Sequence, residues 1–475
     1  MIKGINPALF FIYQPELLFR SGKFHLGAEL SVDKAGKITG SAKLFPSREQ
    51  IVTLKGKAAI PGFVNVHSHS FQRLIRGKSE SRVSSGKDFW SWRGTMYHAA
   101  SRLGPQELYD VARMTFLEMV RAGTTTVGEF HYLHTAPDGR PYDDPNLLSK
   151  QVITAAQSVG LRIVLLRSAY LRSGYELPPD PGQLRFFETA DEFVSNSKEL
   201  FRKFWPDNDD VRYGIAPHSI RAVPLDALHQ VSEWARGMGL PVHMHVSEQI
   251  AENEACVREY GTTPVTLLER EKLLDSRFTA VHAIHITDKE TAILAEAHAT
   301  ICSCPTTERN LGDGILAADK VALQRVNVAL GSDSQAQIDP LEDARQLDYH
   351  LRLKHQQRAN LDQIDGAPLS ARLFDCATAN GARALNIPGG GLSPGSWADF
   401  VTLDLNDPSI AGHSAEDLLP MLVFGMNRSA IKDVFVGGRQ ILFDGRHPLE
   451  EEIVAKYREV HKKVWATTPD RGAGR

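Results

Sequence analysis

The stretch IPGFVNVHSHSFQR, residues 60–73, joins a short apolar run to two histidines that follow it. Residues 63–66 are typical of a β-strand, and His67 and His69 stand two positions apart. Side chains two apart on a strand share a face, so both imidazoles point the same way. Neutral imidazoles at that spacing suit a divalent metal such as zinc. The alternative interpretation is a pair of surface histidines at a strand end.

Three later segments repeat this design, an apolar run that ends in residues able to bind a metal. They are LPVHMHVSEQ at 240–249, FTAVHAIH at 278–285 and NVALGSDSQ at 327–335. Their candidate residues are His243, His245, Glu248, His282, His285 and Asp333. Accident seldom supplies nitrogen and oxygen donors from four strand ends, so the sequence predicts a metal site.

The middle of the chain alternates apolar strand-like runs with amphipathic helical stretches. The strand candidates are FVNVH, TTTVGEF, RIVLLRSAY, VRYGIAPHS, PVHMHV, FTAVHA, ATICSC and VNVALGSD. Apolar strands that alternate with helices indicate a parallel sheet under a helical cover. Eight such units predict an α/β fold, a (β/α)₈ TIM-type barrel over residues 60–390. The polar residues follow the strands, on the face where such barrels hold their active sites.

The two chain ends have a different pattern, with short strands and polar turns. We expect residues 1–59 and 391–447 to form one small β-sandwich domain beside the barrel. Residues 448–475 are expected to form a terminal helix followed by a frayed tail.

The composition argues against a nucleic-acid-binding or membrane protein. The 475 residues carry a formal net charge of −3, with lysine and arginine scattered. The N-terminal segment lacks the long apolar region of a signal peptide, and no stretch is apolar enough to span a bilayer. Four cysteines do not make a disulfide framework, which fits a reducing cytoplasm. We expect a cytoplasmic protein, and by analogy with other barrels a homodimer.

The metal site suggests a hydrolytic role for three residues. His67, His69, His245 and Asp333 would form a four-ligand cage with an open position for water. Asp333 could also accept a hydrogen bond from that water, and His282 could orient it. Glu248 could shuttle a proton to a leaving nitrogen. The alternatives are a packing histidine at 282 and a helix-start acid at 248.

The fourth predicted strand, VRYGIAPHS, has no lysine at its end that could bridge two metals, so we expect one. One metal with a proton-shuttling glutamate suits the hydrolytic removal of ammonia from a carbon–nitrogen double bond. The H-x-E and P-C-x-x-C signature of zinc nucleobase deaminases is absent from this sequence.

Several polar residues near the predicted metal suit a substrate that carries carboxylates. They are Gln72, Arg93, Tyr132, His218 and Arg221. Arginine binds carboxylates through two parallel hydrogen bonds, and the other side chains add donors. The alternative is that Arg93 and Arg221 form structural ion pairs on loops.

The motifs PGFVNVHSHSFQR, DFWSWR, EFHYLH, PHSIRA, PVHMHVSEQ, CPTTERNLGDGI and GSDSQ occur in this order. Together they resemble the amidohydrolase superfamily, and within it a family that removes ammonia from N-formimino-L-glutamate in histidine degradation. The resemblance covers residues 60–390. It implies zinc at His67, His69, His245 and Asp333, with Glu248 and His282 catalytic. It also implies that Gln72, Arg93, Tyr132, His218 and Arg221 hold the two substrate carboxylates, and that the product is N-formyl-L-glutamate.

Two other functions are compatible with parts of this pattern. A guanine-type aromatic-base deaminase would keep the metal site, but the paired arginines argue against its flat, neutral pocket. A metal-free binding relative would be expected to lack a ligand, and every expected ligand is present in this chain.

Overall fold

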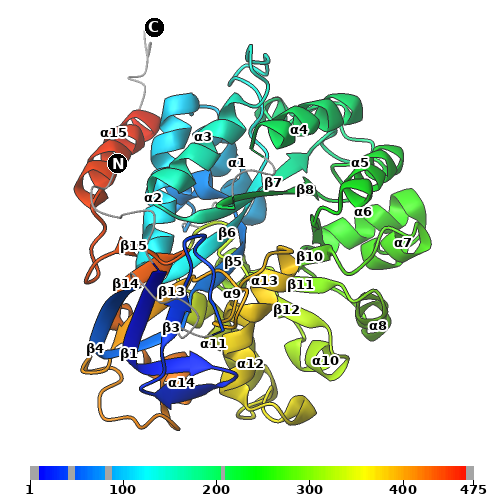
Figure 1. Cartoon of the computed structure of the whole chain (residues 1–475). Coiled ribbons are helices and arrows are strands. Elements are labelled where there is room, and N and C mark those ends of the chain that lie inside the picture. The colour runs from blue at the N-terminus through cyan, green and yellow to red at the C-terminus, as the bar shows by residue number, and fades with distance from the viewer. Residues whose placement is uncertain (1–9, 41–48, 81–87, 205–208, 467–475) are drawn as a thin grey trace, which may run out of the picture.

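The computed structural model describes residues 10–40, 49–80, 88–204 and 209–466. Its centre is an eight-stranded parallel sheet in the order β12-β11-β10-β9-β8-β7-β6-β5 (Figure 1). The strands are β5 (Phe63–Ser68), β6 (Thr124–His131), β7 (Arg162–Ala169), β8 (Val211–Pro217), β9 (Val242–Val246), β10 (Phe278–His282), β11 (Thr300–Ser303) and β12 (Asn327–Leu330). Ser68 of β5 pairs with Asp333, just beyond β12, so the first strand meets the last. The predicted barrel is therefore confirmed.

The barrel strands are buried along almost their whole length, because one face lines the barrel and the other lies under helices. Every residue of β5, β6, β7, β10 and β11 is buried. Such strands need apolar residues on both faces, which explains their continuous apolar runs.

Helices cover the outside of the barrel, and each buries one apolar stripe. In α2 (Pro105–Arg121), Leu108, Val111, Ala112 and Phe116 are buried at helical spacing. The others are α3 (Leu147–Ser158), α4 (Ala190–Phe204), α5 (Leu225–Met238), α6 (Ile250–Tyr260), α7 (Pro264–Arg270), α8 (Asp288–Glu296), α9 (Pro305–Leu311), α10 (Ala318–Leu323), α11 (Pro340–His355), α12 (Leu369–Ala377), α13 (Ala379–Ala384) and α14 (Leu418–Gly425). Helix α1 (Asp88–Ala100) and the 3₁₀ helix η2 (Ser70–Ile75) follow β5.

Both chain ends contribute to a second, mixed sheet of seven strands, shown in blue and orange in Figure 1. Its strands are β1 (Phe10–Arg20), β2 (Lys23–Leu26), β3 (Leu30–Val32), β4 (Glu49–Pro61), β13 (Phe400–Asp404), β14 (Ile431–Val436) and β15 (Arg439–Leu442). N-terminal β4 pairs with C-terminal β13, which joins the two ends of the chain. The predicted small β domain is thus present as one continuous hydrogen-bonded sheet.

A buried arginine connects the small sheet to the barrel. The guanidinium of Arg162, at the start of β7, lies 3.1 Å from the carboxylate of Asp399 and 2.8 Å from that of Asp210. Its Cζ atom lies 3.7 Å from the ring centre of Trp397. The final helix, α15 (Glu450–Trp465), packs on α2, where Arg113 and Glu452 form an ion pair. Among the described residues, no helix is both long and apolar enough to cross a membrane.

Candidate metal and catalytic site

Four of the predicted metal ligands meet at the C-terminal end of the barrel. His67 and His69 come from the end of β5, His245 from β9 and Asp333 from the loop after β12. One donor atom of each lies within 4.8 Å of the donor atoms of the other three, and all four residues are buried. The Asp333 Oδ1 atom is 3.3 Å from Nε2 of both His67 and His69.

Backbone carbonyls orient two of these imidazoles. Nδ1 of His69 lies 2.8 Å from the carbonyl oxygen of Phe130, and Nδ1 of His245 lies 2.9 Å from that of His218. A carbonyl only accepts, so Nδ1 donates and Nε2 keeps its lone pair. Nε2 of His245 then lies 3.2 Å from Nε2 of His67. Nitrogen lone pairs converging beside a carboxylate are the donor set of a divalent cation, so these residues fit a metal.

The backbone at Asp333 is bent to fit this position. Its φ of 46° lies in the left-handed region, which few residues other than glycine adopt. Gln335, which sequence analysis left without a role, is fully buried and braces this turn. Its Nε2 donates to the Asp333 carbonyl over 2.7 Å and to the Ser68 hydroxyl over 2.9 Å. Such strain is found where a site requires a side chain in one place.

The two predicted catalytic residues stand next to this cluster. Nε2 of His282 lies 3.7 Å from Oε1 of Glu248 and 3.8 Å from Oδ2 of Asp333. Burial raises the pKa of Glu248. Burial alone would lower the pKa of His282, but the carboxylates of Glu248, Glu308 and Asp333 outweigh it and raise that pKa. The predicted proton carriers therefore lie within reach of one another.

Glu308 is a neighbour of this site that sequence analysis did not identify. Its Oε1 lies 3.3 Å from Nδ1 of His282, and Glu308 is 2% exposed. The backbone amide of Cys304 and the hydroxyl of Ser303 hold the same carboxylate. Glu308 lies in α9, five residues after the end of β11 and within the motif CPTTERNLGDGI, which was the one sequence signal that could have identified it.

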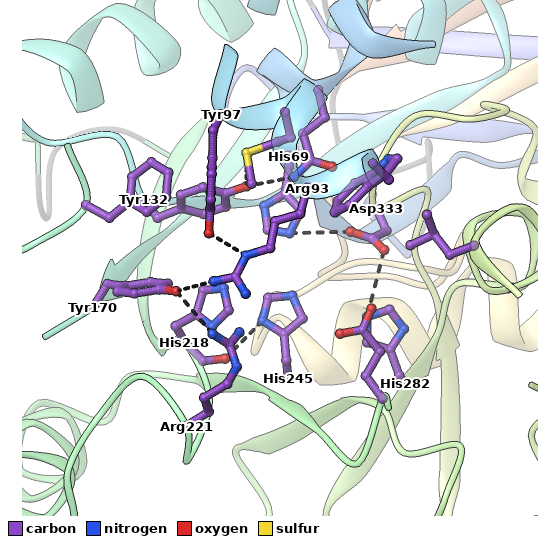
Figure 2. A pocket seen from close by; sticks show the side chains of 16 residues that line it. His69, Arg93, Tyr97, Tyr132, Tyr170, His218, Arg221, His245, His282 and Asp333 are labelled. Carbon is purple, nitrogen blue, oxygen red and sulfur yellow. Dashed lines mark hydrogen bonds and ion pairs between the residues drawn. The ribbon is translucent and has the colours of Figure 1, made fainter. Parts of the chain in front are cut away.

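The five predicted substrate residues line one cavity together with His69, His245, Glu248, His282 and Asp333. The cavity encloses about 560 Å³, part of it open to solvent. Nε2 of Gln72 donates to the phenol oxygen of Tyr132 over 2.7 Å. Burial lowers the pKa of His218, whose ring lies 4.5 Å from that of Tyr170. Figure 2 shows Arg93 and Arg221 pointing toward the phenol of Tyr170.

Further residues line this cavity to which sequence analysis assigned no contact with the substrate. They are Trp92, Met96, Tyr97, Tyr170, Phe186 and Leu311. Two of them could have been predicted from their positions in the sequence, because Tyr170 directly follows β7 and Tyr97 lies one helical turn after Arg93. The structure leaves His243 and His285 out of the metal cluster. Their Nε2 atoms bind the carbonyl oxygens of Ala384 and Asp313.

Comparison with known proteins places these features in context. The sequence model of the amidohydrolase family matches residues 58–441. Formimidoylglutamate deiminase of Pseudomonas aeruginosa is 36% identical over 406 residues, which cover 85% of this chain and 89% of that protein. A 5-methylthioadenosine/S-adenosylhomocysteine deaminase of Thermodesulfovibrio yellowstonii is 25% identical over 403 residues, 84% of each chain.

Solved structures agree on the fold. An amidohydrolase from Brucella melitensis superposes with a TM-score of 0.86 at 31% identity, covering 96% of this chain and 100% of that one. An adenosine deaminase from Xanthomonas campestris with bound zinc gives a TM-score of 0.80 at 22% identity, covering 96% and 98%. At that identity the second likeness concerns the fold alone.

Proposed function

This chain belongs to the amidohydrolase family, and from that premise we propose that it hydrolyses N-formimino-L-glutamate to N-formyl-L-glutamate and ammonia. One observation carries the proposal. Two arginines, Arg93 and Arg221, line the same cavity as Glu248 and three of the four predicted metal ligands, which are His69, His245 and Asp333. This combination offers hydrolytic chemistry and carboxylate recognition within the reach of one small molecule.

The metal is proposed to be one zinc ion held by His67, His69, His245 and Asp333. A divalent metal in such a site polarises a water molecule and makes it acidic enough to ionise near neutral pH. The chain's own contribution is the shape of the site. The backbone carbonyls behind His69 and His245 fix their tautomers, so their Nε2 lone pairs point to one spot.

Glu248 and His282 are proposed to handle the protons of the reaction. The oxygen of water adds to the carbon of the C=N bond, and Glu248 accepts one proton from that water and gives it to the imine nitrogen. The second proton, on the added oxygen, then passes through Glu248 to the same nitrogen as the C–N bond breaks and the C=O bond forms, so both protons of the water leave with the nitrogen as ammonia. His282, held by Glu308 through Nδ1, keeps Nε2 directed at the reacting oxygen.

The remaining residues are proposed to hold the glutamate part of the substrate. Arg93 and Arg221 would meet the two carboxylates. Tyr132, Gln72 and His218 line the same cavity and would add hydrogen bonds to these carboxylates. The rings of Tyr132 and His218 lie 5.0 Å and 4.7 Å from those of the predicted metal ligands His69 and His245.

The test is ammonia release from N-formimino-L-glutamate, measured beside guanine and 5-methylthioadenosine. The proposal expects turnover of the first alone, in proportion to bound metal. Guanine tests the aromatic-base alternative, and 5-methylthioadenosine is included because a less similar relative is named a 5-methylthioadenosine/S-adenosylhomocysteine deaminase. Ammonia release from either of these two compounds, without release from formiminoglutamate, would contradict the proposal.

A further inference from the structure

The loop after β7 contacts both arginines of the proposed carboxylate site. Tyr170, the first residue beyond β7, is 2% exposed. Its phenol oxygen lies 3.3 Å from Nη1 of Arg221 and 3.5 Å from Nη2 of Arg93 (Figure 2). Arg93 belongs to α1 and Arg221 to the loop after β8. Two guanidiniums from distant parts of the chain therefore share one oxygen atom.

A buried amide holds this phenol in place. Gln183 ends the 3₁₀ helix η3 (Pro181–Gln183) and is fully buried. Its Nε2 donates to the phenol oxygens of Tyr170, over 2.8 Å, and Tyr97, over 2.6 Å. The Tyr97 oxygen also accepts a hydrogen bond from Nε of Arg93. One amide thus fixes two phenols, and each phenol contacts Arg93.

The same loop contacts Arg221 a second time. The carbonyl oxygen of Ser173 lies 3.3 Å from Nη1 of Arg221. The Ser173 hydroxyl accepts a hydrogen bond from the backbone amide of Asp180 over 2.8 Å, and the Asp180 carboxylate caps η3. The position of Arg221 is therefore tied to the helix that carries Gln183.

The number of donors at Tyr170 limits how strongly it can hold the arginines. A phenol oxygen has two lone pairs, and three N–H groups converge on this one. Gln183 has the shortest contact, while both guanidinium contacts lie beyond the usual 2.7–3.2 Å range. Tyr170 consequently orients the two guanidiniums while leaving their N–H groups able to donate to a substrate. Like charges this close repel each other, and two carboxylates of suitable spacing would relieve the repulsion.

We propose that Tyr170, held by Gln183, is a positioning residue that sets the separation of Arg93 and Arg221. It would thereby select dicarboxylates by the distance between their carboxylates. The inference rests on the proposed function in one respect, that the two arginines bind carboxylates.

The first test is Tyr170→Phe, which removes one oxygen and keeps the ring packed against Phe186 and His218. Loss of a hydrogen bond to a charged group predicts a KM for formiminoglutamate about 10- to 100-fold higher. We expect kcat to change by less than about threefold, because the metal and Glu248 are untouched. Gln183→Met should reproduce this split between KM and kcat.

Tyr213→Phe is the matched control. Tyr213 lies on β8, is 5% exposed, and packs on Phe201, and its buried hydroxyl has no partner among the described residues. This variant should keep the wild-type KM. In an Arg221→Met background, Tyr170→Phe should raise KM by less than about threefold, because Tyr170 can set the separation of two arginines only while both are present.

The second test does not depend on turnover. Thermal stabilisation is measured with succinate, glutarate and adipate, because glutarate has the same spacing between carboxylates as glutamate. Wild type should be stabilised most by glutarate, and Tyr170→Phe should lose this preference.

The outcomes separate the two proposals. Wild type that prefers glutarate but releases no ammonia from formiminoglutamate would contradict the proposed function and leave the positioning role supported, provided that Tyr170→Phe abolishes the preference. Wild type without a length preference, or Tyr170→Phe with an unchanged preference, would overturn the positioning role.

Discussion

The backbone amide of Asp333 donates a hydrogen bond to the carbonyl oxygen of His67 over 2.9 Å, and the amide of His69 donates one to the carbonyl oxygen of Asp333 over 3.0 Å. The same residues whose side chains form the proposed metal site therefore join β12 to β5 through their backbones. Closing the barrel brings three of the four ligands together, without any contribution from the metal.

This relationship predicts that the metal can be lost while the barrel is kept. Asp333→Asn removes the ligand charge but leaves the backbone hydrogen bonds, and asparagine tolerates the left-handed φ better than most residues. We expect a folded protein by circular dichroism, little bound metal by elemental analysis, and background turnover. Asp288→Asn, on an exposed side chain, should keep one metal and full activity.

Two measurements on wild type test the metal site, the first against the single-metal assignment and the second against any need for a metal. One is a content of two metals per chain. The other is full activity after thorough chelation, whereas we expect chelation to abolish ammonia release and added zinc to restore it.

Glu248→Gln should separate chemistry from binding. The amide has nearly the shape of the carboxylate but cannot carry the proton, so we expect kcat to fall about 10²- to 10⁴-fold. KM and metal content should stay near the wild-type values, since no proposed carboxylate or metal contact is removed. Glu254→Gln, an exposed position on α6, is the matched control. A near-normal kcat for Glu248→Gln would make Glu248 a helix-start acid.

The parts of this molecule that the sequence predicted are those that repeat with a period or lie just after a strand. Continuous apolar runs indicated the eight strands, because a parallel strand is buried on both faces. His67, His69, His245 and Asp333 were predictable because parallel strands end at one edge of the barrel, where the residues at their ends come together.

The parts that sequence analysis missed depend on tertiary contacts. Glu308, on α9, contacts His282 at the end of β10, and Gln183, in the 3₁₀ helix η3, donates hydrogen bonds to two tyrosines. No local pattern connects such pairs, because the distance between them exists only after folding. Gln335 has no role in the sequence analysis, yet it is fully buried and braces the turn at Asp333.

A buried ion pair outside the site predicts loss of stability in acid. Burial alone would raise the pKa of Glu188, but His134 and Arg167 lower it to about 2. Burial lowers the pKa of His134 to about 4, so His134 is neutral near pH 7. At that pH the charge that pairs with Glu188 is the guanidinium of Arg167, whose Nη1 atom lies 2.6 Å from the Glu188 carboxylate. Both pKa values lie below their ordinary values, so both groups stabilise the fold fully only at higher pH.

The lowered pKa values of His134 and Glu188 set the pH range over which stability should be lost. The contribution of His134 should be lost as pH falls from about 6.5 to 4, and that of Glu188 from about 4.5 to 2. For Glu188 the loss is on the order of 3 kcal/mol. The check is the free energy of unfolding against pH. Glu188→Gln should be less stable than wild type at pH 7 and show a shallower decline below pH 4.5. Glu199→Gln, exposed on α4, should follow the wild-type curve.

The last prediction concerns the two arginines that carry the proposed specificity. Removing one partner of a buried charge pair costs about 2–5 kcal/mol, because the other charge is left unpaired. Arg93→Met and Arg221→Met should therefore each lower kcat/KM for formiminoglutamate by roughly one and a half to nearly four orders of magnitude, at ~1.4 kcal/mol per decade. Metal content should not change, and Arg258→Met, exposed on α6, should be neutral.

An analogue that lacks one carboxylate identifies the direct pair. Wild type should lose most of its activity on this analogue, because one guanidinium then has no carboxylate to bind. Replacing the arginine that binds the missing carboxylate should lower kcat/KM for the analogue little further, since that interaction is already absent. Replacing the other arginine should lower kcat/KM by nearly as much as it does with formiminoglutamate. If both arginine variants keep the wild-type kcat/KM for formiminoglutamate, the proposal that this pocket binds two carboxylates is wrong. The aromatic-base deaminase would then become the better account of this site, because it requires the same metal ligands and neither arginine.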